Sequence, residues 1–211
     1  MARIEGDGRN NVLFGTGFDD LIIGFGGNDT AYGGAGEDAI FGSAGRDRLF
    51  GDQGNDVVSG EEGDDRLFGG AGNDSLDGGA DSDFLSGEAG NDRLRGGDSS
   101  DAIYGGRGRD TIEGGAERDR IFYADLAEGG DRIRDFDAGA GGDILDLSSL
   151  LDRLGYSGSD PRDDGVVLLR QQGGNTLLRV DADSDGRGGA VTLAVLEGVV
   201  AISVTDDNFT L

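Results

Sequence analysis

The 211-residue chain has no histidine, cysteine, lysine or tryptophan, and only one proline and one methionine. Catalysis that needs an imidazole or a thiol is therefore excluded, as are zinc sites built from His or Cys ligands. The lack of cysteine also excludes disulfides, although it says little about compartment, because many exported bacterial proteins do without them.

Positive charge is also scarce. Lys and Arg together number 18 against 43 Asp and Glu, which gives a net charge of −25. This charge argues against nucleic acid and anionic membranes as partners, because both are polyanions, and it favours cations. No apolar run approaches the length of a membrane span, and Met1–Asp7 lacks the pattern of an N-terminal signal peptide. We therefore expect no transmembrane segment, and we expect any export signal to lie elsewhere in the chain.

Glycine, in contrast, is abundant at 44 residues, and it recurs with a period of nine. From Gly6 to Phe122 the chain divides without insertion or deletion into 117 residues (122 − 6 + 1), or thirteen nonapeptides. The best copies, such as Gly33–Phe41 and Gly69–Asp77, read G-G-x-G-x-D-x-U-x, where U is aliphatic. Position one is Gly in every copy, position six is Asp in all but the first, and position eight is always apolar. Such a period indicates one structural unit stacked many times.

The residue types at each position predict the unit. Gly at positions one, two and four permits left-handed backbone, so six residues should form a tight turn with carbonyls pointing inward. The remaining three residues should form a short strand. Successive strands should alternate between two parallel sheets, so that two repeats make one coil. Asp at position six then stands beside turn carbonyls in an all-oxygen nest, which suits Ca²⁺ better than Mg²⁺.

The repeats resemble the RTX, or haemolysin-type, calcium-binding repeats along residues 6–122. The resemblance implies a right-handed parallel β-roll in which each Ca²⁺ lies between two turns on the same edge, held by Asp side chains and carbonyls from repeats i and i+2. Thirteen repeats then allow at most 11 sites (13 − 2). The residues expected at these sites are Asp20, Gly24, Gly26, Asp29, Gly33, Gly34, Gly36, Asp38, Gly42, Gly45, Asp47, Gly51, Gly54, Asp56, Gly60, Gly63, Asp65, Gly69, Gly70, Gly72, Asp74, Gly78, Gly79, Asp83, Gly87, Gly90, Asp92, Gly96, Asp101, Gly105, Gly108, Asp110 and Asp119.

The two edges of the roll differ in sequence at position four. In the even-numbered repeats it is Gly from repeat four onward, whereas the later odd-numbered repeats carry Asp81, Ser99 and Glu117. We expect well-formed sites on the even edge and weaker later sites on the odd edge. Alternatively, Asp81 and Ser99 adopt the same backbone conformation with little loss.

Calcium should also control folding. Each coil buries only two position-eight side chains, and residues 6–122 carry 25 acidic groups against 10 Arg, a net charge of −15. Without metal, this segment is expected to be largely disordered.

Aromatic residues occupy position nine in six of the seven odd-numbered repeats. At strand spacing they should form a ladder on the outside of one sheet, with Arg side chains beside it. The ladder either docks an acidic polysaccharide, a cell surface or a protein partner, or it stabilises the sheet and is covered by the C-terminal segment. Its residues are Phe14, Tyr32, Phe50, Phe68, Tyr104 and Phe122, with Arg48 and Arg66.

The period ends at Tyr123, and a solenoid needs an atypical end to cover its last coil. We expect a short capped helix over Ser148–Leu154, strands at Val166–Arg170, Thr176–Val180 and Ala190–Leu196, and an Asp-Gly hairpin turn rather than a calcium loop at Asp181–Gly186. The acidic residues between 131 and 146 offer one more calcium site: Asp131, Asp135, Asp137, Asp143 and Asp146.

Residues 124–211 resemble the C-terminal target domains of type I secreted proteins, through Ile133–Phe136, Asp143–Ser148 and the tail Asp206–Leu211. The resemblance implies an uncleaved signal read by an ABC transporter channel. The interpretation is thus an all-β protein, with a β-roll over 6–122 and a mostly β cap and secretion domain with one short helix over 123–211. We expect a secreted, extracellular bacterial calcium-binding protein without enzymatic activity. The alternatives are a calcium-dependent polysaccharide-binding or adhesion module, or the non-catalytic C-terminal part of a larger secreted enzyme.

Overall fold

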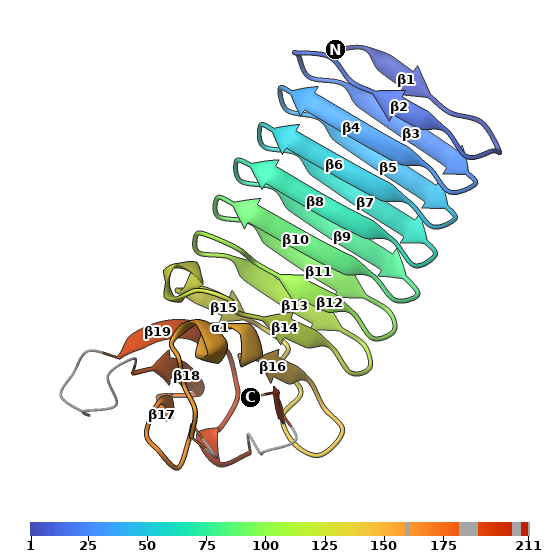
Figure 1. Cartoon of the computed structure of the whole chain (residues 1–211). Helices are drawn as coiled ribbons and strands as arrows, with labels where there is room; N and C mark the ends of the chain where they lie inside the picture. Colours follow the sequence, from blue (N-terminus) through green and yellow to red (C-terminus); the bar gives the residue numbers. More distant parts are fainter. Residues whose placement is uncertain (159–160, 182–189, 204–207, 211) are drawn as a thin grey trace.

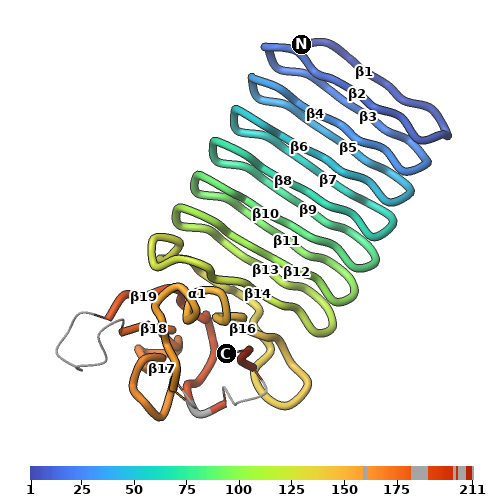
Figure 2. Tube along the Cα trace, in the orientation of Figure 1, coloured from blue at the N-terminus to red at the C-terminus, as the bar shows by residue number. Residues whose placement is uncertain are grey.

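The computed structural model of the chain describes residues 1–158, 161–181, 190–203 and 208–210. Two parallel sheets wind around a common axis in a β-solenoid of about seven turns (Figure 1), which confirms the predicted all-β parallel β-roll. The coils stack in sequence order, from the N-terminus to the C-terminal segment at the other end (Figure 2).

The odd-numbered repeats form a nine-stranded sheet and the even-numbered repeats an eleven-stranded sheet. Within the repeats each strand pairs in parallel with the next strand of its own sheet at a spacing of 18 residues, as in Ile40 with Val58. In spatial order, the nine-stranded sheet contains β2 (Val12–Phe14), β4 (Thr30–Ala35), β6 (Arg48–Gln53), β8 (Arg66–Ala71), β10 (Phe84–Ala89), β12 (Ala102–Tyr104), β14 (Arg120–Phe122), β16 (Ile144–Asp146) and β20 (Phe209–Thr210). The eleven-stranded sheet contains β1 (Arg3–Glu5), β3 (Leu21–Gly26), β5 (Ala39–Ala44), β7 (Val57–Glu62), β9 (Ser75–Ala80), β11 (Arg93–Gly97), β13 (Thr111–Gly115), β15 (Asp131–Ile133), β19 (Val191–Leu196), β18 (Asn175–Val180) and β17 (Val167–Gln172).

The strands are longer than the repeat predicted. From β3 to β10 each has six residues, covering positions seven to nine of one repeat and one to three of the next. The prediction of a six-residue turn and a three-residue strand was therefore wrong. Positions one to three continue the parallel pairing, as Ser43 with Glu61 shows, so only positions four to six turn the chain.

The core is the row of position-eight side chains, because the alternation of a strand turns this position inward. All thirteen are at most 8% exposed: Leu13, Ile22, Ala31, Ile40, Leu49, Val58, Leu67, Leu76, Leu85, Leu94, Ile103, Ile112 and Ile121. The row continues past the repeats through Tyr123, Ile133 and Leu145 into the C-terminal segment.

Both sheets extend beyond the last repeat. β15 pairs with β13, and β16 pairs with β14, so the C-terminal segment covers the end of the roll by continuing its ladders. β19 then adds in parallel, followed by the antiparallel strands β18 and β17, close to the ranges predicted for the three strands. The 3₁₀ turns η1 (Leu126–Glu128) and η2 (Ala201–Ser203) complete this part.

The predicted short helix is α1, over Ser148–Arg153. It buries Leu150 and Leu151, but the predicted side-chain cap is absent, because Leu147 is the N-cap residue. The Ser148 hydroxyl instead donates to Asp146 at 2.6 Å. The predicted turn at residues 182–186 and tail residues 206, 207 and 211 lie outside the described residues.

Candidate metal sites

The position-six residues form two columns of hydrogen bonds, one along each edge of the roll. From Asn11 to Asp101, the backbone N–H of each donates to carboxylate Oδ1 of the Asp 18 residues further on, at 2.6–2.9 Å. The odd column contains Asp29, Asp47, Asp65, Asp83, Asp101 and Asp119, and the even column contains Asp20, Asp38, Asp56, Asp74, Asp92 and Asp110. All twelve residues are at most 3% exposed. The predicted acidic residues therefore do come together, in register, inside the fold.

The second carboxylate oxygen of these residues has no such partner. Oδ2 is buried and accepts no hydrogen bond within the described chain in eleven of them, namely Asp29, Asp38, Asp47, Asp56, Asp65, Asp74, Asp83, Asp92, Asp101, Asp110 and Asp119. Buried polar atoms are normally hydrogen-bonded, so an unpartnered one needs an explanation such as an ion. Six of these oxygens belong to the odd column and five to the even column, which equals the 6 + 5 slots between thirteen repeats.

Burial raises the pKa of all eleven residues, because desolvation penalises the charged form. The pKa of Asp56 rises to about 7 and that of Asp83 to about 8, with neighbouring Asp residues adding repulsion. Asp20 is the exception: hydrogen bonds from the Ala2 backbone and from Thr16 lower its pKa. A proton or a cation therefore stabilises these eleven carboxylates in the fold.

The structure explains why position one is always glycine, and the explanation differs from the predicted left-handed backbone. These glycines do not have positive φ. A Cβ on Gly33 would instead lie 2.6 Å from Asp38 Oδ2 and 2.6 Å from the carbonyl oxygen of Gly51. The same two kinds of oxygen lie within 3.0 Å of that point at Gly24, Gly33, Gly42, Gly51, Gly60, Gly69, Gly78, Gly87 and Gly96. Glycine is needed here because a carboxylate and a carbonyl two repeats away meet over its Cα.

Positions two and four are the ones that use left-handed backbone. Gly34 and Gly36 have φ of 102° and 122°. At position four, Asp81, Ser99 and Glu117 also have positive φ, of 72–74°. The odd edge thus keeps a left-handed turn without glycine, as the alternative expectation held, and weaker calcium binding there stays a prediction. Gly26, also predicted at a site, lies at position three, where an added Cβ would come no closer than 3.8 Å to the Ala44 carbonyl oxygen.

The donor set fits calcium. It consists of carboxylate, amide and carbonyl oxygens, and the chain has no His or Cys to add nitrogen or sulfur ligands. Within the described ranges no three acidic side chains gather around one point, so backbone carbonyls must complete each shell. Ca²⁺ accepts six to eight such oxygens at about 2.3–2.6 Å, whereas Mg²⁺ demands a strict octahedron.

Two of the acidic residues after the repeats continue the columns, and a further calcium site among these residues stays a prediction. Asp131 and Asp143 extend the two columns, accepting the N–H of Asp110 and of Asp119 at 2.9 Å each. Asp135 accepts the N–H groups of Gly114 and Gly115, both at 3.0 Å. Their spacings of 21 and 24 residues from Asp110 and Asp119 differ from the regular 18, so the repeat pattern did not predict these two column ends.

The aromatic ladder forms over its first four members on the outside of the nine-stranded sheet. The rings of Phe14, Tyr32, Phe50 and Phe68 stack with centroids 4.8–5.2 Å apart and planes within 7°. The next position-nine residue, Ser86, has no ring, and Phe68 instead contacts Phe84, whose ring plane is tilted by 49° from that of Phe68. Tyr104 and Phe122 instead line a cavity of about 210 Å³ with residues of the C-terminal segment.

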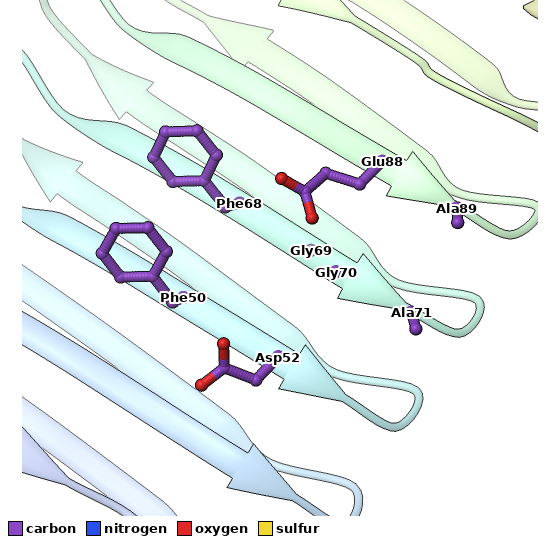
Figure 3. Close-up of a pocket in the computed structure, with 8 residues that line it drawn as sticks. All are labelled: Phe50, Asp52, Phe68, Gly69, Gly70, Ala71, Glu88 and Ala89. Atoms are coloured by element: carbon purple, nitrogen blue, oxygen red, sulfur yellow. The ribbon is translucent and has the colours of Figure 1, made fainter.

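The ladder borders a shallow groove. Phe50 and Phe68 stand beside the carboxylates of Asp52 and Glu88, which lie on β6 and β10 (Figure 3). Arg48 and Arg66 are exposed on the other side of the rings, two residues before Phe50 and Phe68, since alternate residues of a strand share a face. The face therefore carries basic, aromatic and acidic rows, of which the acidic one was not predicted.

Comparisons with known proteins address the repeats directly. The model of the RTX calcium-binding nonapeptide repeat matches residues 5–40, 32–67, 41–76, 59–94 and 95–125. No curated protein matches the chain. Among solved structures, the AlgE6R3 subunit of the Azotobacter vinelandii mannuronan C5-epimerase is 23% identical, with a TM-score of 0.38 over 97% of this chain and 80% of that one. The AlgE6R2 subunit of that enzyme is 27% identical, with a TM-score of 0.40 over 75% of this chain and 92% of that one.

Proposed function

The chain belongs to the RTX calcium-binding nonapeptide repeat family, and on that premise we propose that calcium binding in the two aspartate columns drives folding of the roll after export from the cell. The observation that carries the proposal is the set of eleven buried, unpartnered Oδ2 atoms. Leaving ionised carboxylates buried without a partner costs several kcal/mol each, so the metal-free roll is unstable at neutral pH. Bound Ca²⁺ removes that penalty.

Folding coupled to calcium suits a protein that crosses a membrane unfolded. In a calcium-poor cytosol the net charge of −15 over residues 6–122 keeps the segment expanded. We propose that a type I ABC transporter recognises the C-terminal segment, and that the roll folds in extracellular calcium. Support comes from the resemblance of residues 124–211 to type I target domains. None of the helices in the described ranges has the length and apolarity needed to cross a membrane.

A far-UV circular dichroism titration of chelator-stripped protein tests the coupling. We expect a cooperative transition from coil to β on adding Ca²⁺, and no comparable transition with Mg²⁺. A β signal that is already complete in chelator at neutral pH would refute calcium-driven folding. Export is tested separately, by deleting residues 124–211 and measuring secretion of the remaining chain by a type I transporter.

A second candidate function is calcium-dependent binding of polysaccharide on the ladder face. It is supported by the half-exposed stack, in which parallel rings lie beside Arg48 and Arg66 on the nine-stranded sheet. Because the rings cover one another's faces, their edges form an apolar strip against which sugar C–H groups can pack, and guanidinium groups pair with acidic substituents. In this function the roll is a non-catalytic module, either alone or as part of a larger secreted enzyme.

Retention on an immobilised polyuronate distinguishes the two functions. We expect Phe50→Ala to shorten retention in calcium if the face binds glycan, whereas Phe41→Ala, on the other sheet, should leave it unchanged. Equal retention of both variants and the parent chain would refute this second function. The coupling of calcium to folding would be unaffected.

A further inference from the structure

The even column does not stop where the repeats stop. Asp110 donates its N–H to Asp131 Oδ1 at 2.9 Å, although the spacing is 21 residues instead of 18. Asp131 is fully buried, like the residues before it. By position and by its first oxygen, Asp131 is therefore the next rung of the column.

The second oxygen of Asp131 has a partner, unlike those of the eleven residues between Asp29 and Asp119. The Tyr123 hydroxyl donates to Asp131 Oδ2 at 3.0 Å. Tyr123 is 2% exposed and belongs to the hydrophobic core, so this hydroxyl is held in place. A protein donor thus contacts the oxygen whose counterparts in the interior of the column accept no hydrogen bond.

Tyr123 also continues the nine-residue period of the repeats. It follows Gly114 by nine residues and so occupies position one of what would be a fourteenth repeat. In the interior, position one is the glycine over which the Asp oxygen and the carbonyl two repeats away meet. Here a large side chain replaces that glycine, and its hydroxyl reaches the carboxylate.

At two other ends of the columns, the second carboxylate oxygen likewise accepts a hydrogen bond from the protein. Asp143 Oδ2 accepts the N–H of Asp137 at 2.7 Å, beyond the last repeat of the odd column. At the N-terminal end, both the N–H and the hydroxyl of Thr16 donate to Asp20 Oδ2 at 2.7 Å. Donors therefore bound the eleven unpartnered oxygens at three ends.

We propose that these donors terminate the calcium columns, and that the Tyr123 hydroxyl specifically excludes a cation from Asp131. The hydroxyl hydrogen takes one of the two acceptor positions of Asp131 Oδ2, and the positive end of the O–H dipole repels a Ca²⁺ that approaches the same oxygen. The terminal rungs then hold the C-terminal segment onto the roll by hydrogen bonds alone. This inference rests on the proposed function, because it presupposes calcium in the interior of the columns.

Calcium stoichiometry of the full chain, measured by equilibrium dialysis at saturating Ca²⁺, tests the inference. We expect Asp131→Asn to bind as many Ca²⁺ as the parent chain, since Asp131 is not a ligand. Asp92→Asn, in the interior of the same column, should bind at least one fewer. Loss of a Ca²⁺ in Asp131→Asn would overturn the inference, whereas a parent chain that binds none would refute the proposed function instead.

The role of the hydroxyl is tested by Tyr123→Phe, which keeps the ring and frees Asp131 Oδ2. We expect one additional Ca²⁺. Tyr104→Phe is the matched control, because its hydroxyl donates to Glu128, outside the columns, and its stoichiometry should stay that of the parent chain. A folded Tyr123→Phe chain with unchanged stoichiometry would show that the hydroxyl does not exclude the cation. If this variant fails to fold, the comparison of Asp131→Asn with Asp92→Asn still decides.

Discussion

Asp56 donates its backbone N–H to Oδ1 of Asp74, 18 residues further on, at 2.8 Å, whereas Oδ2 of Asp74 accepts no hydrogen bond from the part of the chain that the structure describes. One carboxylate therefore has two separable roles. Its first oxygen ties neighbouring coils together, and its second is available to a cation. Variants that keep one role and remove the other distinguish folding from metal binding.

Asp74→Asn keeps an oxygen for the Asp56 N–H and removes the charge. In chelator we expect the variant to be more stable than the parent chain at neutral pH, because a buried charge is gone. In calcium we expect it to be less stable by about 2.7 kcal/mol, the contribution of one site at 100 times its Kd. Urea unfolding in calcium and the residual β signal in chelator measure the two effects. Asp77→Asn, which changes a half-exposed charge beside Arg95 on the outer face, should shift the stability in calcium by no more than about 0.5 kcal/mol and leave the chelator signal unchanged. Equal stability of Asp74→Asn and the parent chain in calcium would contradict the ligand role.

Gly51→Ala tests the steric explanation of position one. Its Cβ would lie 2.5 Å from the Gly69 carbonyl oxygen and 2.6 Å from Asp56 Oδ2, so neighbouring coils must move apart. We expect a loss of about 1–3 kcal/mol, as for other overpacked sites, together with weaker calcium binding. Gly17→Ala is the control, because nothing lies within 4 Å of its Cβ and its φ is not positive. Thermal unfolding in calcium compares the two; similar melting temperatures would contradict the steric argument.

The dependence on pH should have opposite signs without and with metal. Burial raises the pKa of the column residues, to about 7 for Asp56 and about 8 for Asp83, above an unfolded value of about 4. The metal-free folded state therefore binds more protons than the unfolded state between about pH 4 and 8. Its stability is fully present below pH 4 and is lost as the pH rises through 7–8. Calcium needs the deprotonated carboxylates, so its affinity should rise over the same range.

Circular dichroism in chelator and calcium titrations at pH 5, 7 and 8.5 measure both trends. We expect the β signal in chelator to be largest at pH 5 and the calcium midpoint to be lowest at pH 8.5. A calcium midpoint that does not change between pH 5 and 8.5 would show that the column carboxylates do not titrate on binding.

The stacking of the repeats and the inward-facing positions were predictable, whereas the length of the strands was not. A period of nine with an apolar residue at position eight fixes which side chains face inward, and the thirteen residues from Leu13 to Ile121 are all buried accordingly. Asp at position six likewise had to fall in register, because parallel strands 18 residues apart repeat every local feature. Local chemistry and stacking point to the same structure, so the sequence alone determined the β-roll and its two acidic columns.

The ends of the columns were decided only by the tertiary structure. Asp131 and Asp143 follow loops of irregular length, so the nine-residue period does not predict that they join the columns. The contact between Tyr123 and Asp131 depends on how the chain folds back over the last coil, as does the cover over Tyr104. The reason for the glycine at position one is also non-local, since its neighbour is a carbonyl from the adjacent coil. Sequence determines what each repeat does to the next one; only packing in three dimensions determines where the stacking stops.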